Sequence, residues 1–335
     1  MMQQREIGST GVMVSEIGFG VWTVATPWWG NTDEAFGVRL IQQACDAGIT
    51  FFVTADTFGN GLGETMLAKA LGGRRDQITI GTKFGYDFYK NTSRRGHEEL
   101  PHDWRPEYVR FALEESLKRL QTDRIDVYQL HNPRMDALQR DDLFALLEQL
   151  KREGKIRAYG PSLGPAINER QIGEGAYAIA PRGTDFVYII YNLLEQMLGQ
   201  ALFAQGRAAK RSFLVRVPHA SGLLDGTVKP ETVFSADDHR AHRTNTDEKK
   251  HQWQVLGLQK VEQLTFLTEG RTLGQAALQF ILSEPSVASV LPNIYNEALL
   301  REFTAAPSAP ALSRVDLDRV AALVEDNFGL TPATA

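Results

Sequence analysis

A lysine and a histidine stand at the ends of two apolar segments that follow each other along this chain of 335 residues. Lys83 ends residues 78–83, and His131 comes directly after residues 125–130. Burial beside an apolar neighbour such as Val53 disfavours the charged form of a lysine, and a neutral amine serves as a general base or forms a Schiff base. We therefore predict that Lys83 and His131 carry the chemistry. The alternative is that both side chains only satisfy hydrogen bonds with carbonyl groups or water.

Other polar and aromatic side chains lie close to the ends of apolar segments and would open into the same pocket. A tryptophan stacks on a flat or glycosyl-type substrate, although it equally packs against its own protein. An aspartate such as Asp56 more often caps the following turn than catalyses. The predicted lining of the substrate pocket is Trp22, Trp28, Trp29, Val53, Phe58, Tyr86, Asn132 and His219. No cluster has metal-ligand spacing, because Asp238, His239 and His242 are only a weak match, so no metal is expected.

Short apolar segments that predict strands alternate with amphipathic segments that predict helices. The expected strands cover residues 18–21, 50–54, 78–83, 125–130, 156–159, 186–191, 213–217 and 288–291. Residues 106–120 are typical of the helices, because a proline comes first and Leu113 and Leu117 share one face. Residues 36–47, 143–152 and 272–282 have a similar spacing. Eight strands that alternate with helices predict a (β/α)8 barrel, in which the carboxyl ends of the strands surround one site.

The other α/β fold, a doubly wound sheet, requires a Gly-x-Gly-x-x-Gly turn after its first strand. Residues 18–23, Gly-Phe-Gly-Val-Trp-Thr, lack the third glycine. A turn between short apolar segments at residues 5–17 predicts an N-terminal β-hairpin ahead of the barrel. We expect a single domain over residues 1–335. About seventy residues separate the last two strands, and their polar part, residues 225–250, is either a lid over the site or a solvated loop without a role.

Four stretches of the chain resemble motifs of the aldo-keto reductases. They are residues 51–63, which join a strand to a glycine-rich loop, and residues 81–85, 126–131 and 217–224. The motifs occur in the family's order, and the resemblance extends from the hairpin to the last strand. It implies the barrel fold and the reduction of a carbonyl group by a nicotinamide dinucleotide. It also places the family's catalytic lysine and histidine at Lys83 and His131.

Two positions within residues 51–63 depart from the family pattern. The family has an aspartate where this chain has Val53 and a tyrosine where it has Phe58. The family tyrosine protonates the carbonyl oxygen, whereas phenylalanine has no hydroxyl group to donate. The resemblance therefore implies that ordinary carbonyl reduction is impaired. It also implies that Lys83 has lost the carboxylate that favours its charged form.

The positions that would hold a dinucleotide are partly retained. By resemblance, Ser162 and Tyr188 face the nicotinamide, although the family usually has asparagine at Leu163 and glutamine at Tyr188. The loop that wraps the diphosphate is nearly intact and includes Ser221, Gly222 and Leu223. The residues that replace the 2′-phosphate and adenine contacts of many members are Asn293, Ile294, Leu299 and Phe303. We expect NAD(P)H as cofactor if dinucleotide binding is retained, and otherwise none.

Composition narrows the classes of function. The net charge of −5, with 43% hydrophobic and 23% charged residues, lacks the basic surface of a nucleic-acid-binding protein. Cys45 is the only cysteine, which rules out a disulfide within the chain. The first residues lack an apolar signal segment, and no apolar run approaches the roughly eighteen residues of a membrane span. We expect a cytoplasmic protein that binds a small-molecule substrate and neither nucleic acid nor membrane.

Three hypotheses for function follow. The first is a barrel enzyme repurposed for a non-redox transformation of a small molecule by Lys83 and His131, of the dehydratase, isomerase, lyase or cyclase type. It rests on the simultaneous changes at the catalytic and cofactor positions. The second is an NAD(P)H-dependent oxidoreductase that reduces a small carbonyl substrate with water, Tyr86 or His131 as proton donor in place of the family tyrosine. The third is a non-catalytic binding barrel. Fold alone does not choose among them.

Overall fold

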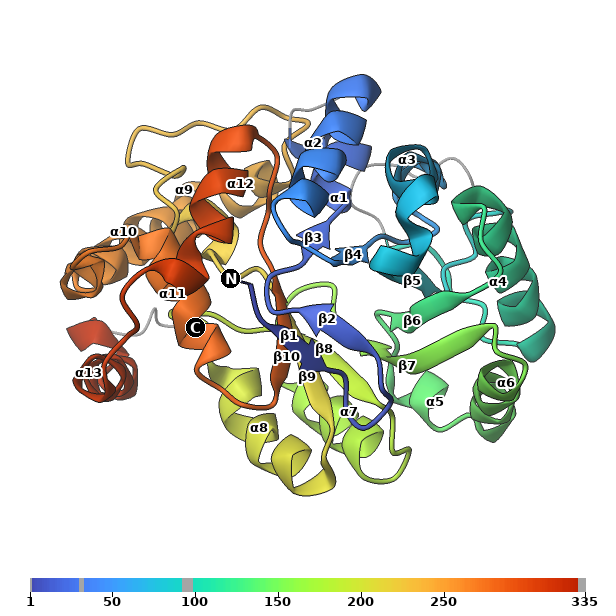
Figure 1. The fold of residues 1–335 in the computed structure, drawn as a ribbon. Coiled ribbons are helices and arrows are strands. Elements are labelled where there is room, and N and C mark those ends of the chain that lie inside the picture. Colours follow the sequence, from blue (N-terminus) through green and yellow to red (C-terminus); the bar gives the residue numbers. More distant parts are fainter. Residues whose placement is uncertain (1, 30–32, 92–98, 331–335) are drawn as a thin grey trace.

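The structure, a computed structural model, describes residues 2–29, 33–91 and 99–330, which form a ring of strands surrounded by helices (Figure 1). The barrel strands are β3 (Phe19–Gly20), β4 (Phe51–Val53), β5 (Thr79–Phe84), β6 (Ile125–His131), β7 (Ile156–Ser162), β8 (Phe186–Ile190), β9 (Ser212–Arg216) and β10 (Val287–Leu291). They pair in chain order, and each pair is parallel. A parallel bridge between Ile17 and Val290 brings the two ends of the sheet together. The predicted (β/α)8 barrel is confirmed.

Helices cover the outside of the ring (Figure 1). They are α1 (Trp22–Ala25), α2 (Glu34–Asp46), α3 (Leu62–Leu71), α4 (Pro106–Leu120), α5 (Met135–Leu138), α6 (Asp141–Arg152), α7 (Arg170–Ile179), α8 (Met197–Ala209), α9 (Asp247–Lys250), α10 (Leu256–Glu262), α11 (Leu273–Leu282), α12 (Glu297–Thr304) and α13 (Arg314–Glu325). Helix α4 begins at the expected proline and buries Leu113 and Leu117. Thr272 and Gln275 form a capping box that begins α11. Within the described residues, no helix is long and apolar enough to cross a membrane.

The predicted N-terminal hairpin is present and closes one end of the barrel. Strands β1 (Gln4–Glu6) and β2 (Met13–Ser15) pair antiparallel. Ile7, Val12 and Val14 are fully buried and belong to the same apolar cluster as the side chains inside the ring. Burial of each such side chain is worth about 2 kcal/mol. In Figure 1 the hairpin lies across the near end of the barrel, where the barrel strands begin.

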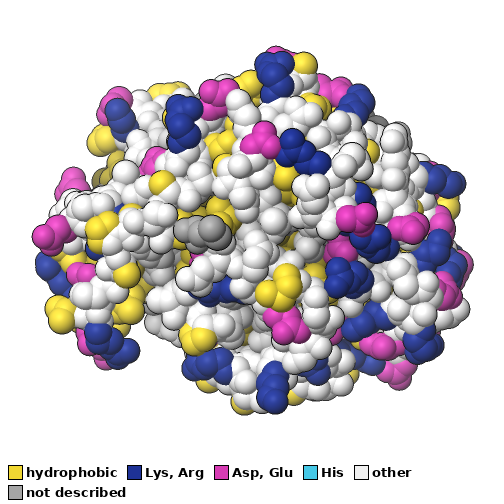
Figure 2. Space-filling model, in the orientation of Figure 1, with side chains coloured by type: hydrophobic (Ala, Val, Ile, Leu, Met, Phe, Trp, Pro, Cys, Tyr) yellow, Lys and Arg dark blue, Asp and Glu magenta, His cyan; other side chains and the backbone are white. Residues whose placement is uncertain are grey.

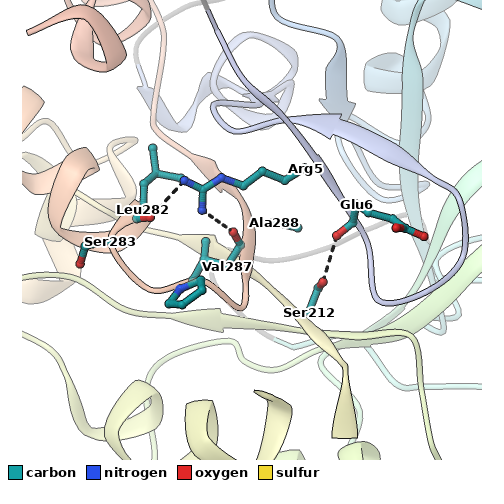
Figure 3. Close-up of a pocket in the computed structure, with 8 residues that line it drawn as sticks. Arg5, Glu6, Ser212, Leu282, Ser283, Val287 and Ala288 are labelled. Atoms are coloured by element: carbon teal, nitrogen blue, oxygen red, sulfur yellow. Dashed lines mark hydrogen bonds between the residues drawn. The ribbon is translucent and has the colours of Figure 1, made fainter. Parts of the chain in front are cut away.

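A cavity of about 430 Å³ lies beside the hairpin, and its lining includes Arg5, Glu6 and Ser212 (Figure 3). The Arg5 guanidinium donates to the carbonyl oxygens of Val287 at 2.9 Å and Leu282 at 3.1 Å. Ser212 and Val287 begin β9 and β10, so the cavity lies at the amino ends of the strands. That end of a barrel supports stability, whereas the carboxyl end carries the site. The surface seen from this side mixes side chains of both charges (Figure 2).

The segment between β9 and β10 contains more regular structure than the predicted loop. A 3-10 turn covers His239–Arg243, and α9 runs through a π-helical turn, His251–Val255, into α10. Local caps explain the difference, because Asp238 accepts a hydrogen bond from the Arg240 amide and Thr246 accepts one from the Lys249 amide. Residues 225–250 therefore contain capped turns where the polar composition had suggested a solvated loop.

Candidate active site

Lys83 lies inside the barrel near the carboxyl end of β5 and is only 5% exposed. Its amine donates a hydrogen bond to the Thr54 carbonyl oxygen at 2.8 Å. The Phe58 ring lies 4.7 Å from Nζ, and the Tyr188 ring lies 5.9 Å away. Burial, helped by the positive charge of Arg216 and opposed by Asp56, lowers the pKa of Lys83 to about 7. A substantial fraction of these amines is therefore neutral at physiological pH.

His131 ends β6 and shares an aromatic neighbour with Lys83. Its ring meets Phe58 edge-on at a centroid distance of 5.9 Å and Tyr86 at 4.8 Å. The strand register pairs His131 with Ser162 on β7 and Ser162 with Tyr188 on β8. The structure therefore brings together both predicted catalytic residues and part of the predicted nicotinamide contacts.

Tyr86 supplies a hydroxyl group beside His131. This hydroxyl donates to Glu99 Oε1 at 2.8 Å and accepts a hydrogen bond from Asn132 Nδ2 at 2.7 Å. The Tyr86 ring stacks on His102 at 4.2 Å, and Arg134 holds Glu99 in an ion pair at 2.8 Å. Burial raises the pKa of Tyr86 above its ordinary value, so its hydroxyl keeps its proton at neutral pH.

The positions that depart from the family pattern are apolar in the structure as well. Val53 is 2% exposed and packs among the side chains inside the barrel. Phe58 lies between Lys83 and His131, in contact with both. Asp56, three residues after Val53, is fully buried, and burial together with the charge of Glu64 raises the pKa of its carboxyl well above the usual range. Phe58 therefore occupies the centre of the site with a ring that has no exchangeable proton.

Arg216 is a site residue that sequence reasoning missed. It ends β9, and its Nη2 donates to the carbonyl oxygens of Leu163 and Pro165, both at 2.9 Å. Its positive charge acts on the Lys83 amine. The signal in the sequence was a cation in the last place of an otherwise apolar strand, which is an expensive position unless the charge is used or paired.

The three tryptophans form one cluster, and residues of the long segment pack on it. Trp22 lies 5.6 Å from Trp29 and 6.1 Å from Trp28 between ring centroids. His239 packs against Trp22 at 5.0 Å and Trp29 at 4.6 Å, and burial lowers its pKa to about 3. The Arg240 guanidinium lies 4.6 Å from the Trp29 ring. His239 and Arg240 therefore pack on these rings, where the sequence had suggested substrate stacking.

The predicted diphosphate loop has a left-handed backbone that is hydrogen-bonded within itself. Ala220, Ser221 and Gly222 have φ angles of 49°, 61° and 109°, and the amides of Ala220, Gly222 and Leu224 donate to the carbonyl oxygens of Val217 and His219. A Cβ atom at Gly222 would lie 2.5 Å from Thr227 Oγ1 and 3.3 Å from Arg240 Nη1. Only glycine fits there, and the Arg240 guanidinium borders the loop. The Arg240 guanidinium is itself paired with the Asp238 carboxylate at 2.7 Å, and the Leu223 side chain is 2% exposed and serves packing.

His219 lies apart from the predicted substrate pocket. Its Nε2 donates to the Gly274 carbonyl oxygen at 3.1 Å, and its ring stacks on Phe303 at 4.3 Å. Both partners belong to the layer of α11 and α12, so the imidazole, at 1% exposure, is enclosed between the loop and these helices. The position of His219 in the loop sequence did not indicate that its side chain turns toward α11 and α12.

The region after the last strand is apolar where the resemblance implies a phosphate contact. Ile294 is fully buried, and Leu299 and Phe303 are 5% and 0% exposed. Asn293 is partly exposed. Arg301 lies on α12 with Leu299 and Phe303. Its side chain is 73% exposed and pairs with Glu297 at 3.8 Å.

Comparison with known proteins identifies the family. The sequence model described as the aldo/keto reductase family matches residues 16–325. The chain belongs to this family. It is 32% identical over 287 residues to aldo-keto reductase YhdN of Bacillus subtilis, covering 85% of this chain and 82% of that protein. It is 27% identical over 316 residues to NADH-specific methylglyoxal reductase of Escherichia coli, covering 91% and 93%.

Solved structures of aldo-keto reductases match the barrel over nearly its whole length. Aldo-keto reductase AKR11C1 from Bacillus halodurans, in its holo form, matches with a TM-score of 0.77 at 28% identity over 96% of each chain. Glycerol dehydrogenase AKR11B4 from Gluconobacter oxydans matches with a TM-score of 0.80 at 23% identity over 99% and 98%, which concerns the fold alone. These relatives favour the oxidoreductase hypothesis, and the hypothesis of a non-redox transformation gains no support from them.

Proposed function

We propose that this aldo/keto reductase is an NAD(P)H-dependent oxidoreductase that reduces a small carbonyl compound with Tyr86 as its proton donor. The observation that carries the proposal is the Tyr86 hydroxyl, held beside the His131 ring by Asn132 and Glu99. It provides an O–H group at the mouth of the barrel, where Phe58 has none. Family membership supports the redox chemistry, and this hydroxyl supports the identity of the acid.

Each residue of the site then has a separate task. The His131 imidazole orients the carbonyl group by a hydrogen bond to its oxygen. The Tyr86 hydroxyl turns from Glu99 toward the same oxygen and donates its proton as negative charge develops there, while the Asn132 amide stabilises the resulting phenolate. The protonated fraction of Lys83 adds positive charge to the site. A nicotinamide dinucleotide, when bound, supplies the hydride.

The residues available for the dinucleotide fit its diphosphate better than a 2′-phosphate. The resemblance implies that the left-handed loop contacts the diphosphate, Arg240 borders that loop at Gly222, and Ser162 and Tyr188 lie on the strands next to His131. Ile294 and Leu299, at the positions where the resemblance implies contacts with a 2′-phosphate and adenine, are buried apolar side chains that offer no polar contact. We therefore propose that NADH binds more tightly than NADPH.

The long segment and the cell compartment complete the proposal. We propose that residues 1–335 act as one barrel domain and that residues 225–250 form a lid, because His239 and Arg240 pack on the tryptophans and border the diphosphate loop. We also propose that the substrate is a small molecule and that the protein acts in the cytoplasm. Slower limited proteolysis within residues 225–250 on addition of NADH would support the lid, and an unchanged cleavage rate would contradict it.

The test compares two tyrosines of the same stretch. Tyr86→Phe removes the proposed acid, whereas Tyr89→Phe removes a hydroxyl that accepts a hydrogen bond from Arg119 at 2.7 Å. With NADH and a panel of small aldehydes, we expect Tyr86→Phe to lower kcat by roughly 10²-fold or more. The dissociation constant of NADH, followed by quenching of the tryptophans, should stay constant in both variants.

Two outcomes would overturn the proposal at different levels. If the protein binds neither NADH nor NADPH at millimolar concentration, the oxidoreductase assignment is wrong, and a non-catalytic barrel or another reaction replaces it. If dinucleotide binds and is oxidised but Tyr86→Phe and Tyr89→Phe have equal kcat values, the acid is another group. Glu99→Gln serves as a second probe, because it keeps an acceptor for Tyr86 while altering the pH profile of kcat.

A further inference from the structure

We propose that Lys83 is a nucleophilic amine that condenses reversibly with small aldehydes to form an imine, an activity separate from hydride transfer. The first observation is the hydrogen bonding of its nitrogen. Among the described residues, Lys83 takes part in no ion pair, and its amine donates a single hydrogen bond to the Thr54 carbonyl oxygen at 2.8 Å. When the amine is neutral, a donor bond leaves its nitrogen lone pair available for attack on a carbonyl carbon.

The walls around the amine favour its neutral, nucleophilic form. Phe58 and Tyr188 present rings at 4.7 Å and 5.9 Å from Nζ, and Val53 takes the place at which a carboxylate would hold an ammonium. An apolar surrounding penalises charge on a lysine and removes the water that would compete with an entering aldehyde. The same walls suit a short carbonyl compound whose substituent is apolar.

Charged groups from several elements act on this amine, and their balance also favours the neutral form. Arg216, fixed at the end of β9 by the Leu163 and Pro165 carbonyl oxygens, repels a second positive charge. Asp56, after β4, opposes it, although burial raises the pKa of the Asp56 carboxyl well above its usual range and so disfavours its charged form. Together with desolvation these charges lower the pKa of Lys83 to about 7. Among the described residues, His131 on β6 contacts the same Phe58 ring as Lys83, and the Tyr188 ring on β8 lies 5.9 Å from Nζ.

The condensation balances with groups already present. The Lys83 nitrogen forms a bond to the carbonyl carbon, and the electron pair of the C=O double bond moves to oxygen, which takes a proton from His131 or Tyr86. The two protons of the attacking nitrogen return to the group that protonated the oxygen, which passes the second of them to the hydroxyl; the C–O bond then breaks, water leaves, and the nitrogen lone pair forms the C=N bond. One amine and one aldehyde give one imine and one water, without oxidant or reductant.

Reductive trapping tests the proposal directly. The full-length protein, without any dinucleotide, is incubated with propionaldehyde and cyanoborohydride at neutral pH, and modified lysines are located by peptide mass spectrometry. We expect Lys83 to be alkylated at least about tenfold faster than Lys69 and Lys118, whose side chains are 59% and 71% exposed, because each pKa unit is worth a factor of about ten in neutral amine. The rate at Lys83 should reach half its maximum near pH 7.

A carboxylate restored beside the amine provides the matched variant. Val53→Asp should raise the pKa of Lys83, reduce trapping at neutral pH by about tenfold or more, and recover it at high pH. Val53→Asn, which is nearly isosteric and uncharged, should keep most of the trapping. If either variant fails to fold, the pH dependence in the unmodified protein decides alone.

Several results would overturn the proposal. They are labelling of Lys83 no faster than labelling of the surface lysines, a half-maximal pH near 10, or equal trapping in the Asp and Asn variants. Because no dinucleotide is present, these results are independent of the proposed reductase activity. A protein that traps aldehyde but binds no NADH would reject only the reductase, and one that reduces aldehydes without trapping would reject only the imine.

Discussion

The two ends of the barrel hold a cationic side chain in opposite ways, and the Arg5 side chain is 23% exposed whereas Lys83 is 5% exposed. At the amino end, Arg5 donates to two backbone carbonyl oxygens and lies 3.5 Å from the Glu16 carboxylate, with which it forms an ion pair. At the carboxyl end, the Lys83 amine donates to one carbonyl oxygen. The charge with the largest effect on its pKa is the like charge of Arg216. The first arrangement stabilises a charge, and the second raises its energy.

This difference separates a structural end of the molecule from a chemical one. A buried cation that is fully paired gains little from changing its protonation or its partner, so it contributes rigidity. A buried cation without a carboxylate is poised to lose its proton or to bind a ligand, and such perturbed groups cluster at functional sites. The cavity at the amino end, where Arg5 is paired with Glu16 and bonded to two carbonyl oxygens (Figure 3), is therefore a poor candidate for catalysis despite its volume.

The largest expected effect falls at the carboxyl end. Lys83→Met and His131→Ala should each lower kcat by roughly 10³-fold, because each removes a group that interacts with the reacting carbonyl. Steady-state turnover with NADH and the best substrate of an aldehyde panel measures this, and circular dichroism verifies folding. Normal turnover in both variants would move the chemistry away from this end.

The pH dependence of the free energy of unfolding should reveal the lowered pKa of Lys83. The pKa of Lys83 is about 7 in the folded chain against an ordinary 10.5, so the unfolded chain binds more protons between these values. The free energy of unfolding therefore rises with pH across this window, and Lys83 contributes about 3 kcal/mol of that rise between pH 7 and about 9.5.

Urea unfolding at both pH values, compared between the natural protein and Lys83→Met, isolates this contribution. The methionine variant should lack it and should be the more stable of the two at pH 7. The same rise in both proteins would mean that Lys83 keeps an ordinary pKa.

The smallest effect belongs to the amino end. Arg5→Ala should lower the free energy of unfolding by about 2 kcal/mol, because it leaves Glu16 Oε2 and two carbonyl oxygens without the Arg5 donor, while Glu16 Oε1 keeps the Gln3 amide. Urea unfolding at constant pH measures it. The value of kcat at saturating substrate should be unchanged, and a large loss of kcat would erase the contrast between the two ends.

The sequence predicted the fold, which is confirmed, and it predicted the places of Lys83 and His131 at strand ends more successfully than the lining of the pocket. Strand ends are set by local apolar patterns, so Lys83 was placed at the end of residues 78–83 and His131 directly after residues 125–130, while their catalytic role stays a prediction. The direction of a side chain within a loop is set by tertiary packing, which is why His219 lies against Phe303 outside the predicted pocket. Arg240 was missed for the same reason, since only the folded segment brings it to Gly222.

The tryptophans show how a correct location can accompany an incomplete role. Their aromatic character predicted a stacking surface, and they do form one cluster. The partner is His239, more than two hundred residues away in the chain, and no local pattern joins these positions. The Tyr86 hydroxyl likewise depends on Asn132 and Glu99 from other parts of the chain.

The hairpin has a consequence for how the molecule is made. Arg5 bonds to the carbonyl of Val287, and the Ser289 hydroxyl donates to the Ser15 carbonyl at 2.8 Å, contacts that span 282 and 274 residues. Neither can form until the last strand has been synthesised, and distant contacts of this kind slow folding. Early strands such as β4 and β5 therefore wait on the ribosome with an open sheet edge, and the barrel closes only when the nascent chain is almost complete.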